Sequence, residues 1–177
     1  GDSPYQSCST YAGNHYLIDL DLLIRQGLLK TSEVAKIDWG RNDSRVDFGK
    51  LYNNRLAVLR LAYGRFRDTE AFCCENEGWI WDYAMFMALK EKNGGKPWYQ
   101  WDEKLKFRDD EALTAAWHQL KAQIYFHCFL QYVFFCQWEA LRGYAHEKGV
   151  KIIGDVPIYV PYDSVDVWSN PELFQLD

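Results

Sequence analysis

The chain has 177 residues, enough for one domain that buries roughly 70% of the surface its unfolded state exposes. Lysine and arginine number 20 and aspartate and glutamate 25, so the net charge is −5, and no basic run could neutralise a phosphate backbone. Nucleic acid is therefore excluded as an expected partner. Aromatic residues make up 17% of the chain. Aromatic side chains either pack in a hydrophobic core or present flat ring faces on which a sugar can stack, and we expect most of these in the core.

The first half of the chain predicts loops, short helices and one strand. Residues 1–14 are dense in glycine, serine, proline and asparagine, which favour a loop, and a loop at the very start suggests that a strand once preceded it. Residues 19–24 carry acidic side chains early and are followed by Gly27, which predicts a short helix. Residues 36–39 predict a short strand, and the apolar spacing over 51–66 predicts a helix.

Two longer helices follow. The first is predicted over about 69–92 and ends at Gly94-Gly95. In the second, apolar residues recur in steps of three or four from Leu113 to Leu141, as on one buried helical stripe. A straight helix over 110–148 would be about 57 Å long at about 1.5 Å per residue. We therefore predict that it bends, or that its first half belongs to a protruding subdomain.

Residues 151–160 predict a buried strand whose apolar run ends on Asp155 and Pro157, and residues 164–177 predict a loop with a helical turn. Helix, glycine, apolar strand and acidic residue is the order found in βαβ units. Active-site residues of a (β/α)8 barrel follow its strands. Asp155 is therefore a candidate, although capping a turn explains it equally well. The same rim would hold four further candidates, Tyr162, Asp163, Asp166 and Trp168.

Other chemistries find little support. The five cysteines are an odd number without a paired C-x-x-C pattern, and free thiols in a reducing cytoplasm explain them most simply. Four histidines form no metal-ligand pattern, since His118 and His127 lie nine positions apart on one predicted helix. No phosphate-binding loop or nucleophile elbow is present. The N-terminus shows no signal peptide, and the longest apolar run, 125–138, is too short and polar to span a bilayer.

Several segments, in order along the chain, resemble the 4-α-glucanotransferases, also called amylomaltases or disproportionating enzymes. These are S-P-Y-Q with A-G-N and Y-L-I-D-L, V-D-F-G-K, D-Y-A-M-F-M-A-L-K with G-G-K-P-W-Y, F-L-Q-Y-V-F-F-C-Q-W, and the closing stretch from I-I-G-D-V-P-I-Y-V to the end. The resemblance implies a retaining transglycosylase on a (β/α)8 barrel. Such an enzyme moves a segment of α-1,4-glucan to the 4-hydroxyl of another sugar and needs no cofactor.

Retaining chemistry needs a nucleophilic carboxylate and a second carboxyl group that acts as acid and then as base, about 5 to 5.5 Å apart. The resemblance adds a third aspartate that stabilises the transition state. In the family all three follow later strands, beyond Asp177. We therefore expect a fragment that is inactive by itself.

The resemblance also assigns three residues to substrate binding. Asp155, in G-D-V-P-I-Y-V, matches the family's aspartate after the third strand, which helps to organise the sugar at the cleavage point. Ser3 and Tyr5, in S-P-Y, match residues after the first strand, and the tyrosine ring lines the glucan groove. Core packing explains Trp168 and the Trp98-Tyr99 pair better than sugar contact does.

The expected fold class is α/β, a partial (β/α)8 TIM barrel from the loop after strand 1 through strand 3, with a helical insertion. Residues 1–66 form the first barrel part, 67–125 the helical insertion subdomain, and 126–177 a barrel helix, strand 3 and the following loop. The expected partner is an α-1,4-glucan or maltooligosaccharide. Two alternatives remain open, a non-catalytic glucan-binding or interaction module and an α-glucan hydrolase sharing the barrel.

Overall fold

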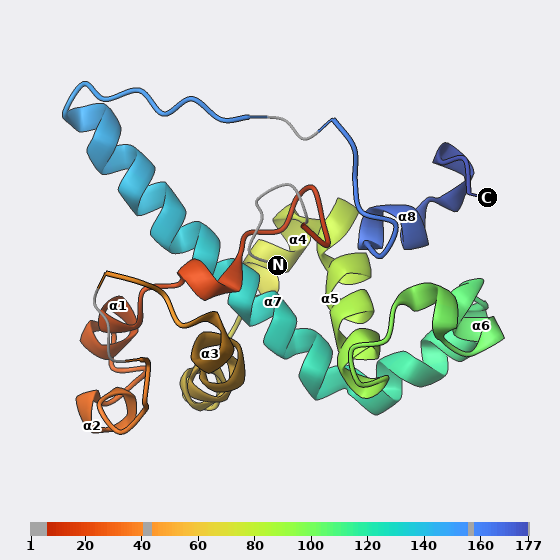
Figure 1. Ribbon diagram of the computed structural model, residues 1–177, viewed down its shortest axis with the longest axis horizontal. Coiled ribbons are helices and arrows are strands. Elements are labelled where there is room, and N and C mark those ends of the chain that lie inside the picture. The colour runs from red at the N-terminus through yellow and green to blue at the C-terminus, as the bar shows by residue number, and fades with distance from the viewer. Residues whose placement is uncertain (1–6, 41–43, 156–157, 177) are drawn as a thin grey trace. The chain divides into compact units, whose positions relative to one another are not determined.

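A computed structural model describes residues 7–40, 44–155 and 158–176 (Figure 1). The chain divides into two compact units. Unit 1 contains the described residues of 1–12, 70–128 and 151–177, and unit 2 contains those of 13–69 and 129–150. The long helix α7 (Asp110–Glu147) contributes residues to both units.

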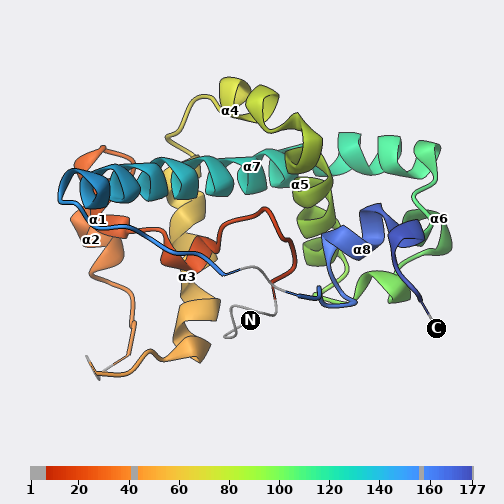
Figure 2. The same ribbon diagram turned by 90° about the horizontal axis from the view of Figure 1, so that it is seen from above.

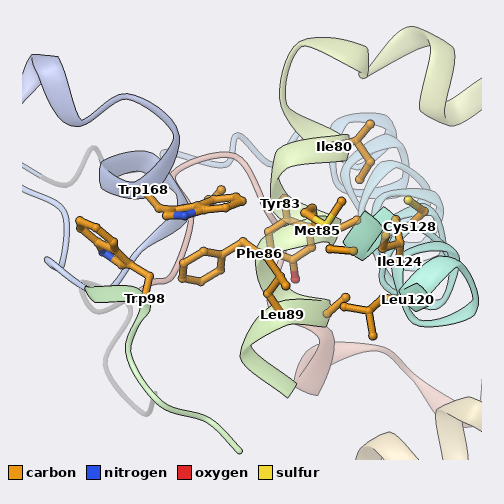
Figure 3. Close-up of a cluster of buried hydrophobic side chains, with 14 of the residues drawn as sticks. Ile80, Tyr83, Met85, Phe86, Leu89, Trp98, Leu120, Ile124, Cys128 and Trp168 are labelled. Carbon is orange, nitrogen blue, oxygen red and sulfur yellow. The ribbon is translucent and has the colours of Figure 1, made fainter. Parts of the chain in front are cut away.

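Unit 1 is a helical assembly around α5. Its elements are α4 (Glu70–Glu75), α5 (Glu77–Lys92), η2 (Trp98–Gln100), α6 (Glu103–Lys106), the first part of α7, α8 (Val165–Ser169) and η3 (Pro171–Leu173). Side chains of α5 are buried on several faces, with Ile80, Phe86 and Leu89 fully covered. Figure 3 shows the reason, since Phe86 points toward the indole rings of Trp98 and Trp168 while α7 lies on the opposite side of α5. A helix buried all round forms the centre of a core.

The helix predicted over 69–92 is two helices. Asn76 separates α4 from α5 with a backbone outside the helical region (φ −116°, ψ 19°). Its side-chain amide donates to the Phe72 carbonyl at 2.9 Å, which occupies an acceptor at the end of α4. The predicted stop is confirmed, because Gly94 and Gly95 follow α5 with φ of +66° and +80°, a region that favours glycine.

Helix α7 bends as predicted. Leu120 has φ −108° and ψ 15°, outside helical values, so two straight segments meet there. Its side chain is 6% exposed and packs in the core of unit 1 with Ile124 and Cys128, both fully buried. The apolar stripe read from the sequence is therefore buried where α7 belongs to unit 1, whereas Leu141, its last predicted member, is 57% exposed.

Unit 2 contains η1 (His15–Leu17), α1 (Leu20–Arg25), α2 (Thr31–Val34), α3 (Phe48–Tyr63) and the second part of α7. The helices predicted over 19–24 and 51–66 are confirmed as α1 and α3. Asp19 caps α1 by accepting the backbone N–H of Asp21 at 2.7 Å. The fully buried Gln131 of α7 accepts the N–H of Gly13 at 2.8 Å and donates to its carbonyl at 3.1 Å. This side chain therefore substitutes for a backbone partner and holds the loop before η1.

The two predicted strands do not form in the described residues. Residues 36–39 are a turn and a loop, and the described part of 151–160 is extended chain without a ladder. Ile153 and Ile158 are each 94% exposed. A parallel strand needs the N–H and C=O groups of a neighbouring strand, and the part of the chain that the structure describes contains no such neighbour. The partial barrel is therefore not confirmed. No helix within the described ranges is long and apolar enough to cross a membrane.

Candidate functional site

The structure describes only one of the three predicted sugar-binding residues. Ser3 and Tyr5 lie outside the described residues. Asp155 is described, is exposed, and lies in the extended segment of unit 1. The geometry of the candidate site therefore comes from the described flanks of these residues, 7–12 and 158–168, which belong to the same unit.

Hydrogen bonds join these two flanks over 156 positions of sequence. The carboxylate of Asp166 accepts the Thr10 hydroxyl at 2.7 Å and the Thr10 backbone N–H at 3.1 and 3.3 Å. The backbone N–H of Val165 donates to the Cys8 carbonyl at 2.8 Å. We call these contacts the Thr10–Asp166 latch. The latch holds the segment that follows the S-P-Y motif against the start of α8.

A second set of contacts anchors the loop before α8. The Asp163 carboxylate forms an ion pair with Lys90 of α5 and accepts the backbone N–H of Trp98 at 3.3 Å. The Trp98 indole donates to the Tyr162 carbonyl at 2.7 Å. Ser164 caps α8 by accepting the Val167 N–H at 3.3 Å. Asp163 and Asp166, two of the candidates at the predicted rim, therefore both hold structural contacts.

The tryptophans of the site region are core residues. Trp98 is 4% exposed and Trp168 is 1% exposed, which confirms the expectation of core packing for both. Trp168 packs 5.7 Å from the Phe86 ring centroid and donates from its indole to the Leu105 carbonyl at 3.0 Å. Figure 2 shows α8, which carries Trp168, beside α5. The Arg108 guanidinium covers the Trp168 ring at 4.4 Å.

Two tyrosines of the same region differ from these tryptophans. Tyr99 is 38% exposed, so the expectation of core packing is wrong for this residue, and Tyr162 is 45% exposed. Their rings stack at a centroid distance of 4.8 Å with an interplanar angle of 10°. Neither pattern nor spacing in the sequence connected Tyr99 with Tyr162, because Tyr99 lies in η2 and Tyr162 in the loop before α8, and the two meet only in the folded unit.

Among the thiols and imidazoles of unit 1, Cys8 is half-buried and His127 is buried. All five cysteines are free. Burial raises the pKa of the Cys8 thiol, whose sulfur lies 3.7 Å from the Met87 sulfur, so this thiol is protonated at neutral pH. His127 is 2% exposed, with Nε2 3.7 Å from the Glu91 carboxylate. Across the described ranges no three His, Cys, Asp or Glu side chains group as metal ligands would.

Comparison with known proteins identifies the family. A family model described as 4-alpha-glucanotransferase matches residues 1–177. The chain belongs to the 4-alpha-glucanotransferase family. It is 46% identical to the 4-alpha-glucanotransferase of Aquifex aeolicus (strain VF5) and 44% identical to that of Thermus thermophilus, with all of this chain aligned in both cases. It spans 36% of the length of each of these glucanotransferases.

A solved glucanotransferase structure is also similar. An amylomaltase from Streptococcus agalactiae in complex with acarbose matches with a TM-score of 0.93 and 42% identity. The match covers 99% of this chain and 37% of that one. The resemblance read from the sequence motifs is thus confirmed at the level of family.

Sequence reasoning missed the latch. Asp166 was expected at the rim because it follows the predicted strand, but Thr10 carried no functional expectation. A serine or aspartate before a helix and an acidic residue in its first turn are local signals. Nothing local connects that acidic residue with a threonine 156 positions earlier.

Proposed function

We propose that this chain carries part of the glucan site of a 4-α-glucanotransferase. The enzyme would transfer segments of α-1,4-glucan to the 4-hydroxyl of a glucan or glucose acceptor by a retaining double displacement, without a cofactor. The observation that carries the proposal is the match over 99% of the chain to an amylomaltase in complex with acarbose. The nucleophile and the acid/base carboxyl group would come from sequence outside these 177 residues, so the chain by itself would be inactive.

Within this proposal Asp155 organises the sugar at the cleavage point, and Ser3 and Tyr5 line the glucan groove. The Thr10–Asp166 latch supports the pairing of these two parts, because it joins the described residues that follow Tyr5 to the described residues that follow Asp155. Glucan binding by a wall built from two segments that are distant in sequence requires such a connection, since the two segments must keep a fixed position relative to each other.

The proposed architecture is the partial (β/α)8 barrel, with 1–66 and 126–177 as barrel parts and 67–125 as a helical insertion. In it, residues 151–160 form a strand once neighbouring strands are present. The almost complete exposure of Ile153 and Ile158 supports this, because an apolar strand without partners has nothing to cover it. We also propose a cytoplasmic location, supported by five free cysteines.

The test uses the protein encoded by the complete reading frame that contains these residues, incubated with maltotriose. Glucose together with longer maltodextrins is expected. Asp155→Asn should lower the rate of transfer by roughly 100-fold, as the loss of one aligned polar group in an active site does, and should leave the melting temperature nearly unchanged. If Asp155→Asn also lowered the melting temperature strongly, the result would indicate a structural role for Asp155.

Other products would favour the two alternatives. Reducing sugar without longer products would identify a hydrolase. Glucan binding without any product would identify a binding module. A melting curve for each variant separates these results from misfolding.

A further inference from the structure

An exposed pair of aromatic side chains lies in unit 1. Tyr99 belongs to η2 and Tyr162 to the loop before α8, and their rings are nearly parallel at 4.8 Å and 10°. Each keeps more than a third of its surface exposed, 38% for Tyr99 and 45% for Tyr162. In a stacked pair one face of each ring meets its partner, which leaves the opposite face for another flat group.

The buried Trp98 contacts both tyrosines and holds them in place. The buried Trp98 ring meets Tyr99 edge-on at 6.0 Å and 79°, and Tyr162 at 5.4 Å and 76°. Its indole also donates to the Tyr162 carbonyl at 2.7 Å, and the next residue, Asp163, is ion-paired with Lys90. Rings fixed in this way lose little conformational entropy when a ligand binds.

A hollow adjoins the pair. It has a volume of about 270 Å³ and is lined by Val160, Tyr162, Val167, Phe174, Gln175 and Leu176. Tyr162 belongs both to the pair and to the hollow. Four of the six lining residues have apolar side chains, and polar groups, among them the Gln175 amide and the Tyr162 hydroxyl, make up a large share of the exposed lining. Small-molecule sites combine apolar walls with polar groups, and this volume is just below the usual lower limit of about 300 Å³.

The geometry points to a second carbohydrate-binding site, in which a glucose unit of an α-1,4-glucan stacks on the Tyr99–Tyr162 pair and extends toward the hollow. The sugar ring would place its C–H face on an aromatic face and its hydroxyls near the Gln175 amide and the tyrosine hydroxyls. The choice of glucan rests on the proposed function. A protein partner is disfavoured, because stable protein interfaces bury about 800 Å² on each side, far more than two half-exposed rings offer.

The experiment is affinity electrophoresis in native gels that contain amylopectin, with the protein of the complete reading frame. Tyr99→Ala and Tyr162→Ala should each weaken retardation roughly two- to tenfold, the range for one aromatic stacking contact. Tyr99→Phe and Tyr162→Phe keep the rings and should keep most of the retardation. Tyr11→Ala is the matched control, because Tyr11 is also exposed and stacked, on Trp79.

A second measurement does not depend on the stability of the alanine variants. Titration of ring-labelled protein with maltoheptaose should shift the NMR signals of Tyr99 and Tyr162, assigned from the two phenylalanine variants, and not that of Tyr11. Equal retardation in Tyr99→Ala, Tyr162→Ala and Tyr11→Ala, or unshifted signals for the pair, would overturn the inference.

The outcomes also separate this inference from the proposed function. Asp155→Asn should lose transfer from maltotriose and keep its retardation, whereas Tyr99→Ala should keep transfer and lose retardation. A protein that transfers glucan but is not retarded overturns the second site only. A protein that is retarded through the tyrosine pair but makes no product overturns the proposed function only.

Discussion

Replacing Asp166 by alanine removes the three hydrogen bonds by which Thr10 meets the start of α8, at 2.7, 3.1 and 3.3 Å. Hydrogen bonds to a charged group contribute about 1.5 to 3 kcal/mol each when well shielded. These contacts are exposed and share one carboxylate, and the Val165 to Cys8 hydrogen bond remains. We therefore expect a loss of only about 1 to 2 kcal/mol in the free energy of unfolding.

We also expect a functional consequence that the loss of stability by itself does not explain, because the variant stays folded. If the latch holds the two parts of the glucan site together, kcat/KM for maltotriose should fall roughly tenfold, because small misplacements of binding groups are costly. Asp102→Ala is the matched control. Asp102 caps α6 in the same unit by accepting the Lys104 N–H at 3.1 Å, so its loss costs about 1 kcal/mol without touching either flank.

The assays are urea unfolding and product analysis with maltotriose, performed on both variants and on a double-mutant cycle with Thr10→Val. A coupling energy of about 0.5 kcal/mol or more between Thr10 and Asp166 is expected for residues in direct contact. Equal losses of kcat/KM in Asp166→Ala and Asp102→Ala would refute the reasoning, because the latch would then act through stability only.

Two further predictions concern unit 2. Hydrogen bonds from Arg65, and one from a backbone N–H, lower the pKa of Glu33 from 4.5 to about 2. The stabilisation is therefore complete above the unfolded value and disappears as the pH falls toward about 2, so urea unfolding should show Glu33→Gln destabilising at pH 7 and neutral near pH 2. A difference that is independent of pH would contradict this. Gly13→Ala would place a Cβ atom on the Phe134 ring and should cost about 1 to 3 kcal/mol, whereas Gly78→Ala, in open space, should cost nothing, and equal melting temperatures would refute the clash.

Features decided by neighbouring residues could be predicted well. The stop of α5 at Gly94, the start of α1 behind the Asp19 cap and the apolar stripe of α7 all depend on side chains within a few positions of one another. The bend of α7 was expected from its length, and Leu120 shows where it occurs. The family motifs likewise carried the assignment to the glucanotransferases.

Strands and long-range contacts could not be predicted in the same way. The run 151–160 has the composition of a buried strand, yet a strand requires partners that composition does not supply, and its described residues remain extended. Asn76 divides a predicted helix through its non-helical backbone, and its side-chain amide shares the Phe72 carbonyl with its own backbone N–H.

By itself, the sequence determined the helices over 19–24 and 51–66, the glycine stop after α5, the bend of α7 and the family. Only the tertiary structure decided that Thr10 meets Asp166 and that Tyr99 stacks on Tyr162. The physical reason is that helix periodicity and capping arise from contacts within one or two turns, whereas these pairs depend on the packing of whole segments around α5.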